Sequence, residues 1–359
     1  MRALVYDEYT TDDDFSKILK IKNLPEPEPR SNEVVFKVIS AGLNYDDIWG
    51  MRGKPLAIPL PHISGTDAAG EVVAIGSDVK NIKVGDRVVS HGNMSCRVCK
   101  ACTDGREFDC TKRTIWGFQT GPNWGAFQEV THLPEVNVSK IPEGVSYDQA
   151  AAASMTLLTS WHMLVGRAKI QPGQIVLIMG GSSGIGTFGI QIAKLFGCTV
   201  IATASPDKLD KCLELGADFA VDHRKDDWHK EVRAISKELA KKKGEAPGID
   251  LSFDHIGETH WNKQLQLLKY GATLVSCGAT TGYNAQTDLR HVFFKGTNIL
   301  GSTQGTKAEL DQGLYWMGQG KIKAAIDSTY TFEQAAEAHT KMLNGKGMFG
   351  KILMKPEGA

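Results

Sequence analysis

Gln174-Ile175-Val176-Leu177-Ile178-Met179 runs directly into Gly180-Gly181-Ser182-Ser183-Gly184-Ile185-Gly186, and a predicted helix over 185–196 follows. The nearly continuous apolar run is typical of a parallel strand buried on both faces. A glycine-rich turn between such a strand and a helix lets a pyrophosphate approach backbone N–H groups at the helix N-terminus. A tight turn that binds nothing is the alternative. The candidate cofactor contacts here are Gly181, Ser182, Ser183, Gly184, Ile185 and Gly186.

The same rhythm of strand and helix continues along the chain. Apolar runs predict further strands over 199–203, 219–221, 249–253 and 273–276. Helices are predicted over 149–166, 206–215, 226–242 and 260–270. Strands that alternate with helices indicate a doubly wound parallel sheet, an α/β Rossmann fold, and we expect this domain to span 157–301. Gly278, just after the last of these strands, is a further candidate cofactor contact.

The end of the second strand bears on the choice between NAD and NADP. NAD sites usually place an acidic residue there to bind the ribose 2′-hydroxyl, and the matching position falls near Ser205. A neutral hydroxyl with Lys208 nearby accepts a 2′-phosphate, so the sequence favours NADP. Two alternatives stay open: Asp207 is the ribose ligand, or Lys208 is only a solvated residue in the first turn of a helix.

The first 150 residues have a different pattern. Short apolar segments over 34–39, 71–76 and 86–89 are separated by Gly, Pro, Asn and Asp, which is typical of a β-rich barrel or sandwich. The strand-like segment 347–353 suggests that the end of the chain returns to this part. We therefore expect a β-rich domain over 1–156 that is completed by 302–359.

Four of the seven cysteines lie close together in the sequence. Cys96, Cys99, Cys102 and Cys110 follow the spacing C-x2-C-x2-C-x7-C. Four thiolates in one short loop can close a tetrahedral zinc site that leaves no position for substrate, so the predicted zinc is structural. Chance clustering, a redox-active cysteine pair and an iron–sulfur cluster are the alternatives.

Composition excludes several classes of protein. The 359 residues include 41 basic and 41 acidic side chains, and this zero net charge argues against a nucleic-acid partner. No apolar run approaches the roughly 20 residues needed to span a bilayer, and no signal peptide is evident. We expect a cytoplasmic protein with no membrane segment.

A β-rich first domain, a four-cysteine lobe and a later dinucleotide fold together resemble the medium-chain dehydrogenase/reductase superfamily. The resemblance implies a GroES-like catalytic domain. In the alcohol dehydrogenases of that superfamily, two Cys and one His hold a catalytic zinc. This sequence has Asn44, Thr66 and Met155 at the matching positions, and none of them is a good zinc ligand. The sequence therefore predicts no catalytic zinc.

Further motifs resemble the zinc-independent reductases of the superfamily, in particular the crotonyl-CoA carboxylase/reductases. These motifs are 115–120 (IWGFQT), 124–127 (WGAF), 253–257 (FDHIG) and the extended charged segment 223–248. The carboxylating members have a glutamate where this chain has Gln119, which argues against efficient carboxylation. Those enzymes are also usually longer and lack the cysteine lobe.

The resemblance implies NADPH-dependent reduction of the C=C bond of a short enoyl-CoA of the crotonyl-CoA or acryloyl-CoA type. Asn44, Phe118 and Gln119 are the candidate catalytic residues, as a substrate or water contact, a pocket wall and a hydrogen-bonding group. For each, a plain structural role is the alternative. A structural role is favoured for His255, and nothing distinguishes Tyr45 as a proton donor.

Two other functions stay open: a quinone or small-enone reductase, and a non-enzymatic redox sensor or binding protein. An enoyl-CoA reductase needs a basic patch to bind the CoA phosphates, whereas a quinone or small-enone reductase does not. The candidate residues for this patch are Arg52, Lys54, Arg290 and Lys295. The resemblance also implies a homo-oligomer, a dimer or a tetramer.

Overall fold

The computed structural model describes residues 1–121 and 125–356, so Trp124 of the sequence motif lies outside the described residues. The chain forms two compact units, which we call the first unit (1–158 and 306–359) and the second unit (159–305). Among the described residues, no helix combines the length and the apolar character that a membrane crossing requires.

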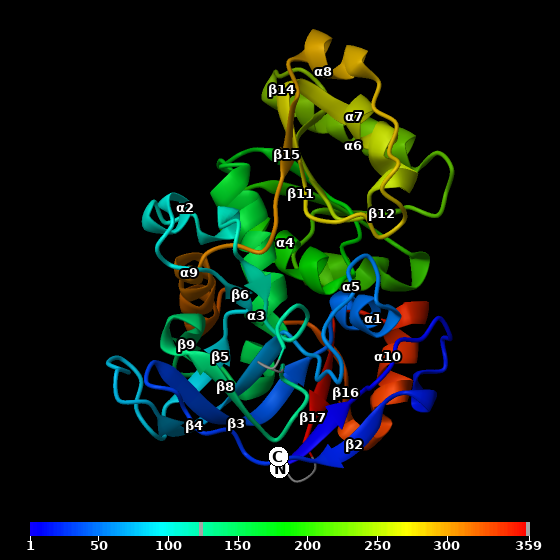
Figure 1. Ribbon diagram of the computed structural model, residues 1–359. Helices are drawn as coiled ribbons and strands as arrows, with labels where there is room; N and C mark the ends of the chain where they lie inside the picture. The colour runs from blue at the N-terminus through cyan, green and yellow to red at the C-terminus, as the bar shows by residue number, and fades with distance from the viewer. Residues whose placement is uncertain (122–124, 357–359) are drawn as a thin grey trace. The chain divides into compact units, whose positions relative to one another are not determined.

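The second unit is built on a six-stranded parallel sheet in the order β12-β11-β10-β13-β14-β15 (Figure 1). Its strands are β10 (Ile175–Ile178), β11 (Thr199–Ala204), β12 (Phe219–Asp222), β13 (Ile249–Asp254), β14 (Leu268–Ser276) and β15 (Asn298–Gly301). Its helices are α4 (Gly184–Leu195), α5 (Leu209–Glu214), α6 (Trp228–Lys243), α7 (Trp261–Leu267) and α8 (Leu289–Lys295). This is the predicted doubly wound sheet.

The central strands are buried as their composition predicts. Every residue of β10 is buried, and its neighbours β11 and β13 run parallel to it. One predicted helix ends early, and another changes its helix type near its end. The helix expected to reach residue 270 stops at Leu267, because Leu268 already pairs with Ile249 as part of β14. The helix expected over 149–166 is α3 (Tyr147–Trp161), which continues as a π-helix over His162–Arg167.

The first unit contains a seven-stranded sheet. It runs in the order β16-β17-β3-β4-β5-β9, with β8 on the other side of β3, and only the β16–β17 pair is parallel. The strands are β3 (Glu33–Gly42), β4 (Asp67–Ile75), β5 (Arg87–Ser90), β8 (Val130–Pro134), β9 (Val138–Lys140), β16 (Ile326–Thr331) and β17 (Lys351–Lys355). Two smaller sheets pair β1 (Arg2–Val5) with β2 (Lys20–Asn23), and β6 (Asn93–Met94) with β7 (Thr114–Ile115).

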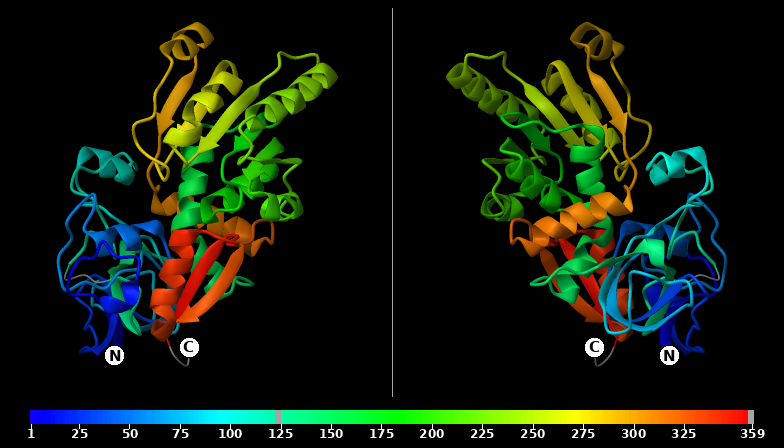
Figure 2. Two further views of the ribbon diagram at one scale, coloured as in Figure 1. Left: turned by 90° about the vertical axis from the view of Figure 1, so that its right-hand side faces the viewer. Right: turned by 90° about the vertical axis from the view of Figure 1, so that its left-hand side faces the viewer.

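The end of the chain completes this unit. Strand β17 pairs with β3 near Gly42 and lies beside β16, as Figure 2 shows in the red and orange ribbons. The remaining helices of the first unit are α1 (Tyr45–Arg52), α2 (Lys100–Thr103), α9 (Lys307–Gly318) and α10 (Ala335–Asn344). The tail therefore places side chains from residue 351 onward next to those at the end of β3.

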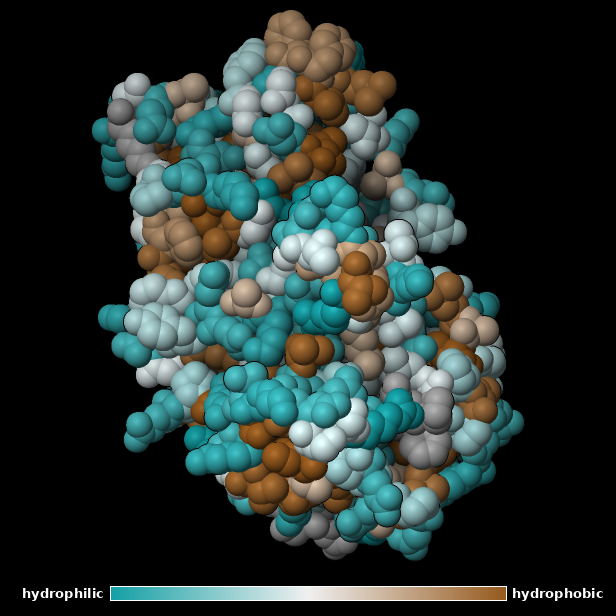
Figure 3. Space-filling view, turned by 60° about the vertical axis from the view of Figure 1, so that its left-hand side comes forward, coloured by the Kyte–Doolittle hydropathy of each residue, from teal (hydrophilic) through white to brown (hydrophobic). Residues whose placement is uncertain are grey.

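Large apolar side chains are exposed at one edge of the second unit. They lie on α8, on the edge strand β15 and on β14, and α8 forms the brown group at the top of Figure 3. This edge surface comprises Leu289, Phe293, Phe294, Ile299 and Tyr270. Clustered exposed aromatic residues are uncommon on a monomer surface and mark interaction sites.

Candidate functional site

The glycine-rich turn joins β10 to α4. Ser183 is the N-cap of α4, and its Oγ accepts a hydrogen bond from the N–H of Gly186 at 2.9 Å. A Cβ added to Gly186 would lie 2.2 Å from the carbonyl oxygen of Gly180, so no other residue fits there. The first turn of α4 carries no acidic side chain. The turn thus offers backbone N–H groups and a helix N-terminus to an anion, which fits a pyrophosphate.

Two polar side chains support this turn from neighbouring strands. Thr203, on β11, accepts from the N–H of Gly180 at 3.1 Å. His255, which follows β13, lies with its Nε2 3.1 Å from the Oγ of Ser183. Burial lowers the pKa of His255, so its ring is neutral at pH 7. His255 therefore has the structural role that the sequence favours, but at the cofactor turn itself. The feature of the sequence that pointed to this location was the position of His255 directly after a predicted buried strand.

The carboxyl ends of β11 and β12 hold the predicted ribose site. Ser205 follows β11 and hydrogen-bonds Asp207, which lowers the pKa of that carboxyl group. Arg224, two residues past β12, lies with its Nη2 3.4 Å from Asp207 Oδ1. Sequence reasoning missed Arg224, because only the parallel pairing of β11 with β12 brings it to this edge. A neutral hydroxyl, one carboxylate and one guanidinium thus meet here.

Lys208 is not a solvated helix residue, because only 8% of its surface is exposed. It lies in the short 3-10 turn Pro206–Lys208 that precedes α5, near Cys212 and His223. Burial raises the pKa of Cys212 to about 12 and lowers that of His223 to about 4, and the charge of Lys208 is a smaller influence on both. The structure therefore shows a buried lysine in the turn that follows the predicted ribose position at Ser205.

Gly278 lies beyond β14, next to the end of β13. A Cβ on Gly278 would lie 2.9 Å from the carbonyl oxygen of His255. Its own carbonyl accepts from Ser276, which also donates to Asp254 at 2.8 Å. Close backbone packing accounts for the glycine, and its place at the carboxyl edge of the sheet is where ligands of such folds bind.

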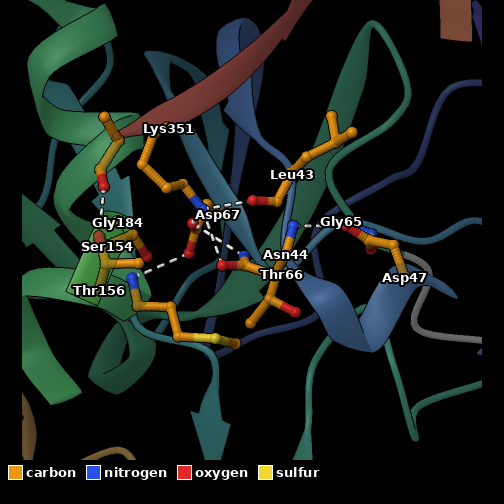
Figure 4. A network of polar contacts seen from close by, with 12 residues as sticks. Leu43, Asn44, Asp47, Gly65, Thr66, Asp67, Ser154, Thr156, Gly184 and Lys351 are labelled. Atoms are coloured by element: carbon orange, nitrogen blue, oxygen red, sulfur yellow. Dashed lines mark hydrogen bonds and ion pairs between the residues drawn. The ribbon is translucent and has the colours of Figure 1, made fainter. Parts of the chain in front are cut away.

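Asn44 lies in a buried polar network of the first unit (Figure 4). Its Nδ2 donates to Asp67 Oδ2 at 2.9 Å, and its Oδ1 accepts from Lys351 Nζ at 2.7 Å. Lys351 also donates to Asp67 Oδ2 at 2.9 Å and to the carbonyl of Leu43. Lys351 and Asp67 are 4% and 0% exposed. The network fixes the orientation of the Asn44 amide and leaves one of its two amide hydrogens for another acceptor.

Two more carboxyl groups lie within the same network. Asp47 Oδ2 accepts from the Asn44 N–H at 2.8 Å, and burial raises the pKa of Asp47. Asp46 Oδ2 accepts from the Thr66 hydroxyl at 3.1 Å, and its buried Oδ1 has no partner among the described residues. Burial and the nearby charge of Asp67 raise the pKa of Asp46 to about 6. The network therefore holds three acidic groups near one ammonium group.

The positions that match the zinc ligands of alcohol dehydrogenases are close together in this network. Thr66 bonds Asp46, and the backbone N–H of Met155 donates to Asp67 Oδ1 at 2.9 Å. Together with Asn44 they offer a hydroxyl, a thioether and an amide, which are poor zinc ligands. The ammonium group of Lys351 lies against the same Asp67 and Asn44 and adds positive charge without a metal.

Phe118 and Gln119 lie in the turn that follows β7. Phe118 is 6% exposed and packs in an apolar cluster with Ile48 and Met51 of α1. Gln119 Oε1 accepts from the Ile115 N–H at 3.0 Å and so closes the turn. Both side chains thus have structural contacts. Tyr45 packs edge-on against Trp49, with ring centroids 5.6 Å apart.

The four predicted metal ligands come together. One sulfur from each of Cys96, Cys99, Cys102 and Cys110 lies within 4.8 Å of the others, an arrangement that can hold a metal ion. The lobe is fixed to the rest of the first unit by Glu107, which binds Arg97 at 3.3 Å and the N–H of Lys307 at 2.8 Å. Since Lys307 is the first residue of α9, the lobe supports that helix.

Of the residues in the predicted patch for CoA phosphates, Lys295 has the most hydrogen-bond partners within the protein. Its Nζ donates to the carbonyl groups of Leu265, Gln266 and Leu268, so its charge is used within the second unit. Arg290 pairs with Asp288 at 2.7 Å and Arg52 pairs with Asp13. Lys54 is exposed.

Comparisons with known proteins decide the family. Residues 30–143 match the model of the alcohol dehydrogenase GroES-like domain, and residues 184–319 match that of the zinc-binding dehydrogenases. The crotonyl-CoA carboxylase/reductase of Cereibacter sphaeroides is 31% identical over 93% of this chain and 83% of its own. The chain belongs to the medium-chain dehydrogenase/reductase superfamily. It is thus an oxidoreductase of this superfamily, and the predicted fold class is confirmed.

Other members of the superfamily are also similar. The acryloyl-coenzyme A reductase of Sulfurisphaera tokodaii is 27% identical over 94% of this chain and 96% of its own, and human quinone oxidoreductase is 28% identical over 94% of each. Among solved structures, an NAD-dependent alcohol dehydrogenase has a TM-score of 0.91 and 35% identity over 99% of both chains. A crotonyl-CoA carboxylase/reductase in complex with NADP has a TM-score of 0.87 and 25% identity over 99% of this chain and 94% of that one.

Proposed function

We propose that this protein is an NADPH-dependent reductase of short enoyl-CoA thioesters. The observation that carries the proposal is the Asn44–Asp67–Lys351 network, because Asn44 stands at a position that the resemblance matches to a catalytic zinc ligand and is held there by a carboxylate and an ammonium group. Relatives named crotonyl-CoA carboxylase/reductase and acryloyl-coenzyme A reductase support the substrate class.

When bound, NADPH supplies a hydride to the β-carbon of the enoyl group, and a proton then reaches the α-carbon. Negative charge builds up meanwhile on the thioester oxygen and requires hydrogen-bond donors. The second amide hydrogen of Asn44 is the donor that we assign to this oxygen. Asp67 and Lys351 hold the amide in place, and the charge of Lys351 stabilises the developing anion. In this proposal Phe118 and Gln119 line the substrate pocket, as a wall and as a hydrogen-bonding group.

The preference for NADP rests on the residues at the ends of β11 and β12. Arg224 and the hydroxyl of Ser205 bind the 2′-phosphate, and Lys208 adds positive charge beneath it. Asp207 is held by Ser205 and Arg224, and in this proposal it orients the guanidinium group. A charged fork of this kind recognises phosphate oxygens.

Gln119 argues against efficient carboxylation. Its Oε1 is engaged by the N–H of Ile115, and an amide carries no negative charge. The hydride transfer does not depend on this side chain.

We further propose that Cys96, Cys99, Cys102 and Cys110 bind one structural zinc ion. Their sulfur atoms are close enough for one tetrahedral ion, and four thiolates close its shell. The contacts of Glu107 with Arg97 and Lys307 then let the ion stabilise the start of α9.

A second copy of this chain is the partner that we assign to the edge surface. Strand β15 ends the sheet of the second unit, and exposed edge strands readily pair. A two-fold axis would bring β15 against its own copy and cover the aromatic residues of α8. Light scattering is expected to give at least twice the chain mass, and a Phe293→Asp variant should lower it to one.

The test of the main proposal compares substrates. NADPH oxidation should be fast with crotonyl-CoA, slow with benzoquinone and unaffected by bicarbonate. Activity on benzoquinone alone would favour the second candidate function, a quinone reductase, which the human relative suggests. A carboxylated product would overturn the inference from Gln119.

A further inference from the structure

Gln304 has two unusual features together. It is 7% exposed, yet neither its Oε1 nor its Nε2 has a hydrogen-bond partner among the described residues. Its φ is +47°, in the left-handed region that a glutamine rarely adopts. A buried amide without partners is unfavourable, and so is this backbone conformation. Both features are typical of a group that is preorganised for a ligand.

The place of Gln304 in the fold limits what this ligand is. It follows β15 at the carboxyl edge of the sheet, where the N–H of Ser302 bonds the carbonyl of Ser276. The phosphate turn follows β10, and the ribose site of the adenosine half follows β11 on one side of it. A bound dinucleotide extends across this edge, so its nicotinamide half must lie on the other side, over β13, β14 and β15.

We infer that the side-chain amide of Gln304 binds the carboxamide group of the nicotinamide ring. Gln304 Oε1 accepts from the carboxamide NH2, and Gln304 Nε2 donates to the carboxamide oxygen. A primary carboxamide offers one donor and one acceptor side by side, which is the pattern that a glutamine amide complements. The inference rests on the dinucleotide site of the proposed function, but it does not depend on the acyl substrate. Gln304 would orient the ring whose C4 gives the hydride.

The test measures binding of NADP and of its 3-acetylpyridine analogue by calorimetry, without acyl substrate. The analogue keeps the carbonyl oxygen and loses the NH2 donor. Wild type should bind NADP several-fold more tightly than the analogue. A Gln304→Met variant should bind NADP about tenfold more weakly, which reflects the two lost hydrogen bonds. The same variant should bind the two compounds equally. Gln319→Met, at an exposed glutamine that follows α9, is the matched control and should behave as wild type.

Thermal unfolding of the apoprotein checks the structural role. Methionine removes two buried atoms that lack partners, so Gln304→Met should melt no lower than wild type. Unchanged NADP affinity in this variant would overturn the inference, and so would equal weakening for NADP and the analogue. Failure of wild type to bind NADP at all would instead count against the proposed function.

Discussion

Lys351 donates to Asp67 across 2.9 Å, and both side chains are almost completely buried although 284 positions separate them in the chain. The pair joins β17 to the start of β4. It holds Asn44, whose position the sequence resemblance matches to a catalytic zinc ligand, in a fixed orientation.

Removal of one partner should be costly for stability. A Lys351→Met variant leaves Asp67 buried without its cation, and we expect a loss of about 3–5 kcal/mol in the free energy of unfolding. Urea unfolding measures it. Lys355→Met is a matched control on the same strand, because Lys355 pairs with Asp148 at a partly exposed position and its loss should cost much less, about 1 kcal/mol. Equal losses in the two variants would contradict a buried ion pair.

Asp46 should make stability depend on pH. Its pKa in the folded protein is about 6, above the usual value of 3.8, so the folded state binds the proton more tightly than the unfolded state. This contribution to stability is complete below pH 4 and is lost as the pH rises through 6. An Asp46→Asn variant should therefore be more stable than wild type at pH 8, by about 2–3 kcal/mol.

The stability gain of Asp46→Asn should disappear at pH 4. Unfolding curves at both pH values measure it, with the exposed Asp12→Asn as control. A gain of the same size at both pH values would show that the carboxyl group does not titrate in this range.

The cofactor preference should depend on Arg224. An Arg224→Ala variant loses a charge-assisted contact with the 2′-phosphate, so its Kd for NADPH should rise at least about tenfold. Its Kd for NADH should not change. Arg290→Ala, at another exposed arginine paired with an aspartate, is the control. If the affinities for NADPH and NADH fell by the same factor, Arg224 would not be a contact of the 2′-phosphate.

The cysteine lobe should bind one zinc ion per chain. Metal analysis of the purified protein measures this, and Cys102→Ser should lower the zinc content and the melting temperature more than the rate of hydride transfer. Cys198→Ser, outside the lobe, should keep its zinc. Iron in place of zinc, or a metal-free protein of full stability, would refute the structural zinc site.

The sequence predicts the central strands of the Rossmann sheet well, because β10 and β11 are almost wholly buried and apolar. The edge strand β15 was not predicted, since it is short and largely exposed. Leu268 shows the limit: it belongs to a helical pattern, but pairing with Ile249 makes it a strand residue. The clustering of the four cysteines was predictable from their spacing alone. Lys351 and Arg224 were not, because their partners are set by strand pairing between distant segments. Gln304 was missed since no local pattern reports a buried amide without partners.

The fate of the transferred hydrogen tests the account most directly. Crotonyl-CoA is incubated with the enzyme and NADPH deuterated at C4 of the nicotinamide, and the thioester product is analysed by mass spectrometry and NMR. Enoyl-CoA reduction predicts butyryl-CoA with one deuterium at C3 and a solvent-derived hydrogen at C2. Recovery of unchanged crotonyl-CoA, from a preparation that oxidises NADPH with benzoquinone, would contradict the proposed function.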